Sequence, residues 1–258
     1  MKNIIIVTFV MLSLTACLVD PPKTQQQVQA EYLPVTNTDP ETIKSGSINW
    51  PGDMSTVQTS ADNLLGRNFL IMLDVSGSMG ESACNAREEK MVVAKTAIEM
   101  FIKQVPADDN IGLAVFSNDA FLIQPLIPAG TGRDELLKKL ANLNPSNGTA
   151  IASAIKLGYT ELTRQGKDQG GYGEYYLVMV SDGANTYGPE PGSDIQFVLE
   201  NSPIVLYTIG FCMGQNHVLN QPGKTLYREA ERPEELTFAL QAVLVESAEY
   251  DSASTFNQ

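Results

Sequence analysis

Beyond Arg67 the sequence alternates short, almost continuous apolar runs with longer stretches in which apolar residues recur at steps of three and four. Strands covered on both faces produce uninterrupted apolar runs, and amphipathic helices produce the three-and-four spacing. The pattern predicts an α/β fold: a doubly wound, mostly parallel sheet with helices on both faces. The expected strands are residues 69–73, 111–116, 175–180 and 204–209, with 120–123 as one short antiparallel edge strand.

Amphipathic helices are expected between and after these strands. Apolar stripes run through residues 91–105, 136–143 and 151–162, and a last helix begins near Pro233, which suits a first helical position. Thr131 and Asp134 stand at capping-box spacing ahead of the second of these helices. We expect the folded domain to span residues 67–248, with residues 249–258 as a C-terminal tail.

The amino-terminal segment has the pattern of an export signal. Lys2 precedes an apolar run, Ile4 to Leu14, that is much shorter than the ~20 residues of a membrane-spanning helix. Leu14-Thr15-Ala16-Cys17 resembles the bacterial lipobox, which implies that residues 1–16 are a signal peptide and that Cys17 carries a lipid such as palmitate. Leu18 stands where an Asp would favour the inner membrane, so the resemblance favours the outer membrane of the cell envelope. The alternative is an ordinary apolar strand that ends at a cysteine by chance.

Residues 17–66 are rich in Pro, Gln, Thr, Asn and Asp and show no sustained apolar period. They predict a flexible, lipid-anchored tether, with Trp50 either docked on the domain or part of a short ordered patch. The formal charge of −13 becomes −14 once Lys2 leaves with the signal peptide. Nucleic acid and anionic lipid surfaces would repel such a protein, whereas metal ions and cationic partners suit it.

Residues 74–80 follow the first expected strand, at the edge where open α/β sheets bind ligands. Side chains at alternate positions of an extended turn point the same way, so we expect Asp74, Ser76 and Ser78 to face one point. Hydroxyl and carboxylate oxygens suit a hard cation such as Mg²⁺, with Mn²⁺ or Ca²⁺ as alternatives, and disfavour zinc.

The Asp-x-Ser-x-Ser spacing resembles the first motif of the metal-ion-dependent adhesion site (MIDAS) in von Willebrand factor A-type (VWA) domains. Asn147-Gly148-Thr149-Ala150 is similar to the family's threonine loop, and residues 178–183, which contain Asp182, are similar to its aspartate loop. The resemblance covers residues 67–248 and implies the Rossmann-like VWA fold. It implies a metal site built from Asp74, Ser76, Ser78, Thr149 and Asp182.

In the family, the two serines and the threonine bind the cation directly, and the aspartates act mainly through water or as a further ligand. Neutral hydroxyls leave a cation electrophilic, so an Asp or Glu of a protein partner is expected to complete its coordination. The expected function is metal-dependent protein–protein interaction in adhesion, assembly or scaffolding, without catalysis. Residues 81–87, 187–194 and 211–224, the last with His217 and Lys224, would set specificity.

Cys84 and Cys212 follow expected strands that the family's strand order separates by only one other strand. Because disulfides persist in an exported protein, the resemblance implies a disulfide between them that braces the loops around the ion. Two free buried thiols are the alternative.

Simpler interpretations of the motifs remain open. The stretch Asp-x-Ser-x-Ser-x-Gly could be a polar turn with a helix cap, Thr149 suits a helix N-cap, and Asp182 with Gly183 suits an ordinary turn. Ser78, Asp182 and His217 occur in the chain order of an α/β-hydrolase triad, so a serine hydrolase is the alternative function, although the turn lacks the Gly-x-Ser-x-Gly pattern. Otherwise His217 is expected to be a solvated loop residue. A third interpretation is a scaffold that keeps its metal for stability alone.

Overall fold

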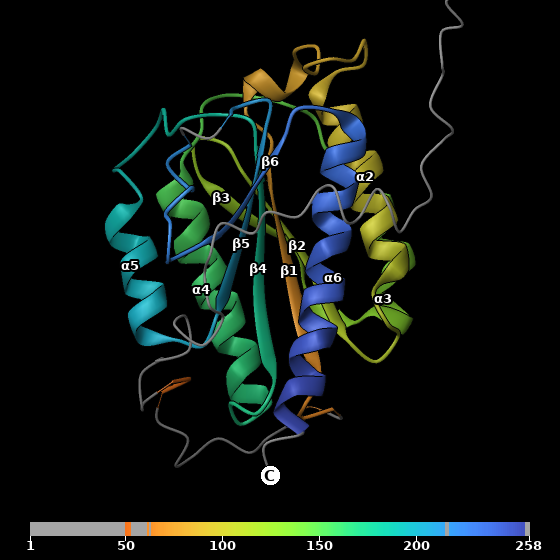
Figure 1. Ribbon diagram of the computed structural model, residues 1–258, viewed down its shortest axis with the longest axis vertical. Helices are drawn as coiled ribbons and strands as arrows, with labels where there is room; N and C mark the ends of the chain where they lie inside the picture. The colour runs from red at the N-terminus through yellow and green to blue at the C-terminus, as the bar shows by residue number, and fades with distance from the viewer. Residues whose placement is uncertain (1–49, 53–60, 62, 215–216, 256–258) are drawn as a thin grey trace, which may run out of the picture. The chain divides into compact units, whose positions relative to one another are not determined.

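The computed structural model describes residues 50–52, 61, 63–214 and 217–255, with side chains described as far as residue 248. The expected signal peptide, Cys17 and most of the expected tether lie outside these residues. The described residues form one six-stranded sheet in the order β3-β2-β1-β4-β5-β6 (Figure 1). None of the described helices combines the length and the apolar character needed to cross a membrane.

The sheet is parallel except at one edge, which confirms the predicted fold class. The parallel strands are β1 (Arg67–Asp74), β2 (Asn110–Phe116), β4 (Glu174–Ser181), β5 (Val205–Phe211) and β6 (Leu226–Ala230). The edge strand β3 (Ala120–Pro128) is antiparallel to β2, as expected, but it is longer than residues 120–123. Its prolines conceal it in the sequence, and an edge strand tolerates proline because one side of it has no ladder partner.

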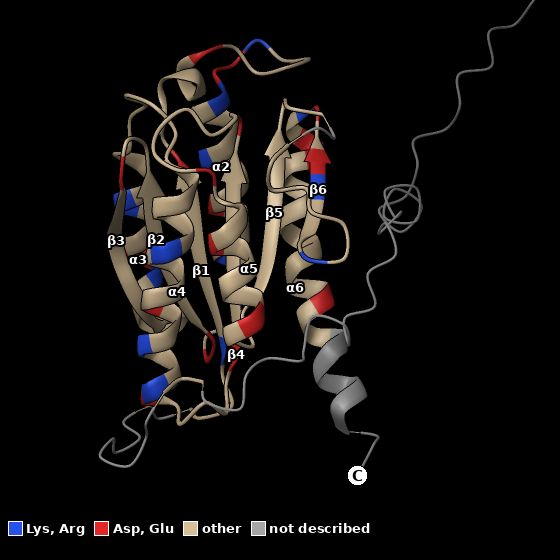
Figure 2. Cartoon of the chain, turned by 90° about the vertical axis from the view of Figure 1, so that its left-hand side faces the viewer, with Lys and Arg blue, Asp and Glu red and all other residues tan. Residues whose placement is uncertain are grey.

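Helices cover both faces of the sheet. Figure 1 shows α2 (Lys90–Gln104), α3 (Ala129–Ala141) and α6 (Pro233–Thr255) on one face, and α4 (Ile151–Asp168) and α5 (Gly192–Asn201) on the other. The side chains of β1 alternate between the two cores: Phe69, Ile71 and Leu73 join the first, and Leu70 and Met72 join the second. Burial on both faces explains the unbroken apolar run of this strand. The same holds for β5, which carries no charged residue (Figure 2).

One local prediction is wrong, and two elements of the structure were not predicted. The capping box ahead of α3 is wrong, because the helix begins at Ala129 directly after β3 and Thr131 lies inside it, donating its hydroxyl hydrogen bond to the carbonyl of Pro128. Helix α5 and strand β6 were not expected from the sequence. The first is short and the second, Leu-Tyr-Arg-Glu-Ala, is a charged edge strand, so neither carries a strong apolar pattern.

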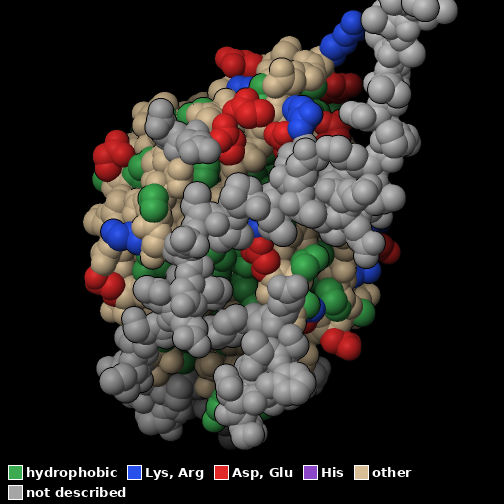
Figure 3. All heavy atoms as spheres, in the orientation of Figure 1, with side chains coloured by type: hydrophobic (Ala, Val, Ile, Leu, Met, Phe, Trp, Pro, Cys, Tyr) green, Lys and Arg blue, Asp and Glu red, His purple; other side chains and the backbone are tan. Residues whose placement is uncertain are grey.

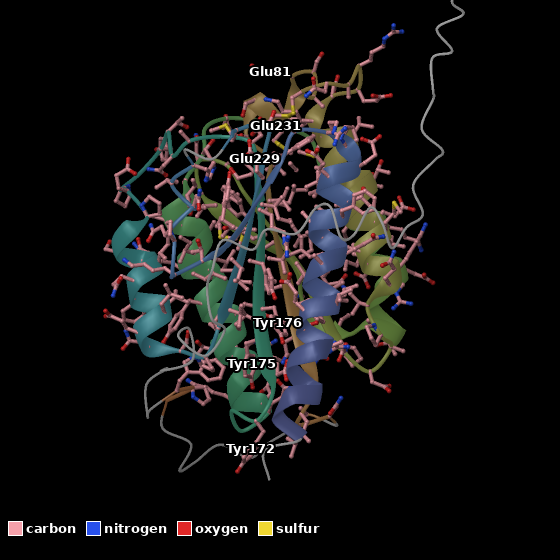
Figure 4. The ribbon with its side chains drawn as sticks, viewed as in Figure 1. Glu81, Tyr172, Tyr175, Tyr176, Glu229 and Glu231 are labelled. Atoms are coloured by element: carbon pink, nitrogen blue, oxygen red, sulfur yellow. A yellow bond between two sulfur atoms is a disulfide. The ribbon has the colours of Figure 1, made fainter. Side chains whose placement is uncertain are left out.

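Trp50 docks on the domain, at the end of the sheet where β4 begins. Its indole Nε1 donates a hydrogen bond of 3.1 Å to Thr163 Oγ1 on α4, and its ring meets that of Tyr175 edge-on, with 4.5 Å between centroids. A Cβ at Gly166 would lie 2.3 Å from Cη2 of the indole, so this glycine makes room for the ring. Figure 4 labels Tyr175 at this end of the sheet, and Glu81, Glu229 and Glu231 at the other end.

Candidate metal centre

The first loop of the site follows β1. The loop contains a short 3-10 helix, η2 (Gly77–Gly80), in place of the extended turn that the sequence predicts, with Ser76 in extended conformation just before it. This geometry still brings the two serines together, with 3.0 Å between Ser76 Oγ and Ser78 Oγ. Ser76 occupies the N-cap position of η2 but its side chain makes no capping hydrogen bond. Its hydroxyl is therefore directed at Ser78 and not at the helix terminus.

Asp74, the last residue of β1, is completely buried. Its Oδ1 accepts a hydrogen bond of 2.8 Å from the backbone N–H of Ser76, and its Oδ2 accepts one of 2.7 Å from the hydroxyl of Ser181. Burial raises the pKa of Asp74 from 3.8 to about 6, although the hydrogen bonds from Ser181 and Ser76 favour the charged form. Sequence reasoning missed Ser181, which lies at the end of β4 beside the predicted Asp182.

Asp182 begins the third loop of the site, and its side chain has no exposed surface. Its Oδ1 accepts a hydrogen bond of 2.9 Å from Ser78 Oγ, which joins the first and third loops. Its Oδ2 pairs with Lys90 Nζ at 2.8 Å. Burial opposes the charge of Lys90, but the bonds to Asp182 and Glu81 prevail and raise the pKa of Lys90 above its ordinary value. No motif singles out Lys90, because charged residues are ordinary on the polar face of an amphipathic helix.

Thr149 lies in the second loop, just before α4, and is 3% exposed. Two backbone hydrogen bonds fix this loop to the first one: Gly77 N–H donates to the Asn147 carbonyl at 2.8 Å, and Ser146 N–H donates to the Val75 carbonyl at 2.7 Å. A Cβ at Gly183 would lie 3.4 Å from Thr149 Oγ1 and 3.8 Å from Ser78 Oγ. The three loops therefore meet at Gly183.

The interpretation of Thr149 as a helix cap does not hold. The N-cap of α4 is Ala150, and the side chain of Asn185 accepts the hydrogen bond of the Ile151 N–H at 3.1 Å. Thr186 Oγ1 accepts the N–H of Thr149 at 2.9 Å. Within the described part of the chain, the hydroxyl of Thr149 has no hydrogen-bond partner. The side chains of Asn185 and Thr186 thus accept the backbone N–H groups at the start of α4, and the Thr149 hydroxyl is left to bind a ligand.

The side chains that converge here suit a hard cation. The five residues predicted from the sequence supply only hydroxyl and carboxylate oxygens, which are the donors that Mg²⁺ and similar ions prefer. Among the described residues there is no cluster of three or more His, Cys, Asp or Glu side chains that could hold a metal ion, so this site combines hydroxyls with two carboxylates. The residues present therefore fit a magnesium-like ion held by hydroxyls.

The predicted disulfide is confirmed. Cys84 and Cys212 are bonded with an S–S distance of 2.03 Å and 5.5 Å between their Cα atoms. The bond joins the loop between η2 and α2 to the residue after β5, and only β4 lies between β1 and β5 in the sheet. It therefore links two loops at the end of the sheet that carries Asp74 and Asp182.

His217 is 4% exposed, so its expected place as a solvated loop residue is wrong. Its Nδ1 accepts the N–H of Leu219 at 3.0 Å, which leaves Nε2 protonated and able to donate to the carbonyl of Gly183 at 2.7 Å. Burial lowers the pKa of His217. Both ring nitrogens are thus engaged with backbone groups, and Ser78 bonds to Asp182 and Ser76. No pairing of Ser78 with His217 supports a hydrolase triad within the described residues.

Comparison with known proteins places these features in a family. Residues 69–184 match the family model of the von Willebrand factor type A domain. A stretch of 100 residues, 38% of this chain, is 32% identical to an uncharacterized protein of Borreliella burgdorferi. That match spans 28% of the relative's length, so the relative is much longer than the shared part.

Solved structures share the fold. An aerotolerance-related membrane protein from Bacteroides fragilis aligns with a TM-score of 0.55 and 20% identity, over 71% of this chain and 100% of that one. Proximal thread matrix protein 1 from the mussel byssus, solved with zinc occupying its MIDAS motif, aligns with a TM-score of 0.55 and 13% identity, over 71% of this chain and 46% of that one. At these identities the likeness establishes the fold.

Proposed function

Since this chain carries a von Willebrand factor type A domain, we propose that the domain holds a divalent cation at the carboxyl end of its sheet and binds an acidic side chain of a partner protein through it. The observation that carries the proposal is the position of the Ser78 hydroxyl. It lies 3.0 Å from Ser76 Oγ and 2.9 Å from Asp182 Oδ1, and it flanks Gly183 together with the hydroxyl of Thr149. Three loops far apart in the sequence thus supply oxygens to one place.

The proposed roles follow from the contacts of each residue. Ser76, Ser78 and Thr149 hold the cation directly, because their hydroxyls are the neutral oxygens that meet at the site. Asp74 and Asp182 act mainly by orienting these hydroxyls and bound water, since both oxygens of each carboxylate already accept hydrogen bonds from the protein. When bound, the cation supplies a Lewis-acidic position that a carboxylate of the partner can occupy.

The surface around the site bears on the choice of partner. Figure 3 shows several acidic side chains at the end of the molecule where Figure 4 labels Glu81, Glu229 and Glu231. Without a cation, this end would repel an acidic partner. A bound divalent ion dominates the field near itself, so the proposed interaction requires the metal and would be lost with a chelator.

We also propose that Cys17 carries the lipid that fixes the chain to the bacterial outer membrane, with Mg²⁺ as the resident ion and Mn²⁺ or Ca²⁺ as substitutes. Leu14-Thr15-Ala16-Cys17 supports the lipid, and the oxygen-only donor set supports the ion. Mass spectrometry of the exported protein tests the lipid: the expected mature amino terminus is an acylated Cys17, and C17S should leave the membrane fraction.

Isothermal titration calorimetry of the full chain with Mg²⁺, Mn²⁺, Ca²⁺ and Zn²⁺ tests the metal. We expect T149A and S78A to lose Mg²⁺ binding, whereas T160A should bind like the wild type. Thr160 is a matched control because it is an exposed threonine on α4, the helix that follows Thr149. Absence of heat with every ion in the wild type would refute the proposal, and binding of Zn²⁺ alone would refute the choice of ion.

The partner is tested by crosslinking in the native envelope with and without EDTA. We expect a crosslinked protein that disappears with EDTA and with D74A, but persists with H217A. Ester hydrolysis that depends on His217 would favour the hydrolase instead. Stabilisation by Mg²⁺ without any crosslinked protein would favour a metal kept for stability alone.

A further inference from the structure

Lys90 is a buried cation inside the proposed metal site, and the proposed ligand set gives it no role. It is the first residue of α2, and its side chain is 11% exposed. Its Nζ lies 2.8 Å from Asp182 Oδ2 and 3.5 Å from Oε2 of Glu81, whose side chain is 72% exposed. The pairing with Asp182 is therefore the buried one, and the contact with Glu81 faces solvent.

Lys90 and Ser78 bind different oxygens of the Asp182 carboxylate. Ser78 donates to Oδ1 and Lys90 donates to Oδ2, so the carboxylate is held from both sides. An ammonium group at this distance also offsets the negative charge of Asp182. Without Lys90 the site would contain two uncompensated carboxylates, Asp74 and Asp182; with it, one of the two is compensated.

We propose that Lys90 sets the charge of the cation site: it weakens binding of the divalent ion and leaves more of the bound ion's positive charge available to an acidic partner. The inference rests on the proposed function, because it concerns the same ion and the same partner chemistry. A site with less negative charge holds a cation less tightly, and the cation in it attracts a carboxylate more strongly. Lys90 is thus a positioning residue that acts through Asp182 and trades affinity for the ion against affinity for the partner.

A purely structural role for Lys90 predicts the opposite result. If Lys90 only clamps Asp182 in place, its replacement would loosen the third loop and weaken cation binding. The sign of the change in cation affinity therefore separates the two roles. Lys95, on the same helix, offers a matched control because its Nζ donates to the carbonyls of Ala141 and Leu143, away from the site.

Calorimetric titration of the full chain with Mn²⁺ at constant ionic strength tests the inference in the wild type and in K90M, K90Q, K90R and K95M. We expect K90M and K90Q to bind Mn²⁺ on the order of tenfold more tightly, the size of effect expected when one close charge is removed. K90Q keeps a donor for Asp182 and covers the case in which K90M fails to fold. K90R and K95M should bind Mn²⁺ like the wild type. K90R keeps the positive charge beside Asp182, and Lys95 makes its contacts elsewhere.

In the second part of the test, acetate serves as a simple carboxylate probe and is titrated into the Mn²⁺-saturated protein. Its binding is measured from the change in the relaxation rate of water protons near Mn²⁺. Acetate should bind several-fold more weakly to K90Q than to the wild type. Equal or weaker Mn²⁺ binding by K90M and K90Q would overturn the inference while the proposed function stands. Unchanged acetate binding would overturn the part that concerns the partner. A wild type that takes up no Mn²⁺ would refute the proposed function, and the inference with it.

Discussion

The hydroxyl of Ser181 donates a hydrogen bond of 2.7 Å to Oδ2 of Asp74, joining the carboxyl ends of two neighbouring parallel strands beneath the proposed cation. Both residues have no exposed surface, so the bond is shielded from water. Hydrogen bonding to the charged carboxylate lowers the pKa of Asp74, but burial raises it more, to about 6. The protonation of Asp74 is therefore poised to change in a mildly acidic medium.

The raised pKa of Asp74 predicts that cation binding depends on pH. The pKa of Asp74 is raised in the cation-free fold, so this group contributes stability below pH 3.8 that is lost as the pH rises through about 6. A cation favours the carboxylate, and its binding releases the proton. We expect affinity for Mn²⁺ to fall as the pH drops through about 6 and to level off well above it. Calorimetry from about pH 5 to about pH 8 would measure this profile.

Replacement of Ser181 sharpens this prediction. S181A removes a donor to the charged form, so the pKa of Asp74 should rise further and the midpoint of the affinity profile should move to higher pH. S153A is the matched control, because Ser153 donates to Asp119, a surface carboxylate. A profile that is flat between these pH limits, or that moves equally in both variants, would contradict the assignment to Asp74.

The disulfide predicts a loss of stability on reduction. Cys84 and Cys212 are separated by 128 residues, and a crosslink over so long a loop restricts the unfolded chain strongly. The double variant C84A/C212A should lose about 2–4 kcal/mol of unfolding free energy in denaturant titration. Mass measurement before and after reduction checks the bond itself, and an unchanged mass would disprove it.

The docking of Trp50 predicts that residues ahead of the sheet stabilise the domain. W50A should cost about 2 kcal/mol of unfolding free energy, less than a fully buried tryptophan, because Trp50 is half-buried. G166A should cost a similar amount in the wild type, since its Cβ would lie 2.3 Å from the indole. The double variant W50A/G166A should lose less than the sum of the two.

Gly192 provides the control for this double-mutant cycle of Trp50 and Gly166. A Cβ there meets nothing within 4 Å, and the residue is helical like Gly166, so G192A should leave stability within about 0.5 kcal/mol of the wild type. Strictly additive losses for W50A and G166A would show that Trp50 does not occupy this place on α4.

His217 predicts a second, independent pH effect. Its pKa is lowered by burial, so the stability it contributes is present above about pH 6.5 and is lost as the pH falls through the lowered pKa. H217A should cost about 1–3 kcal/mol, because the Leu219 N–H and the Gly183 carbonyl lose their partner. It should also flatten the fall in stability below pH 6.5 in thermal unfolding. An undiminished fall would assign the effect to other groups.

Much of the architecture was predictable from periodicity. Strands β1, β2, β4 and β5 are buried on both faces, and their apolar runs therefore appear without interruption in the sequence. Edge strands lack this signature. The charged residues of β6 and the prolines of β3 reflect partial exposure, so the first was missed and the second was expected to be shorter.

The sequence by itself determined the five candidate ligands, because Asp74, Ser76, Ser78 and Asp182 lie at the ends of apolar strand runs and Thr149 lies just before a helical stripe. Only the tertiary structure decided what surrounds them. Ser181, Lys90 and His217 act on the site across distances of 34 to 107 residues in the chain, and no local pattern marks such partners. Local spacing fixes the strand ends and turns, whereas burial and the charge balance of the site depend on which loops the folded sheet brings together.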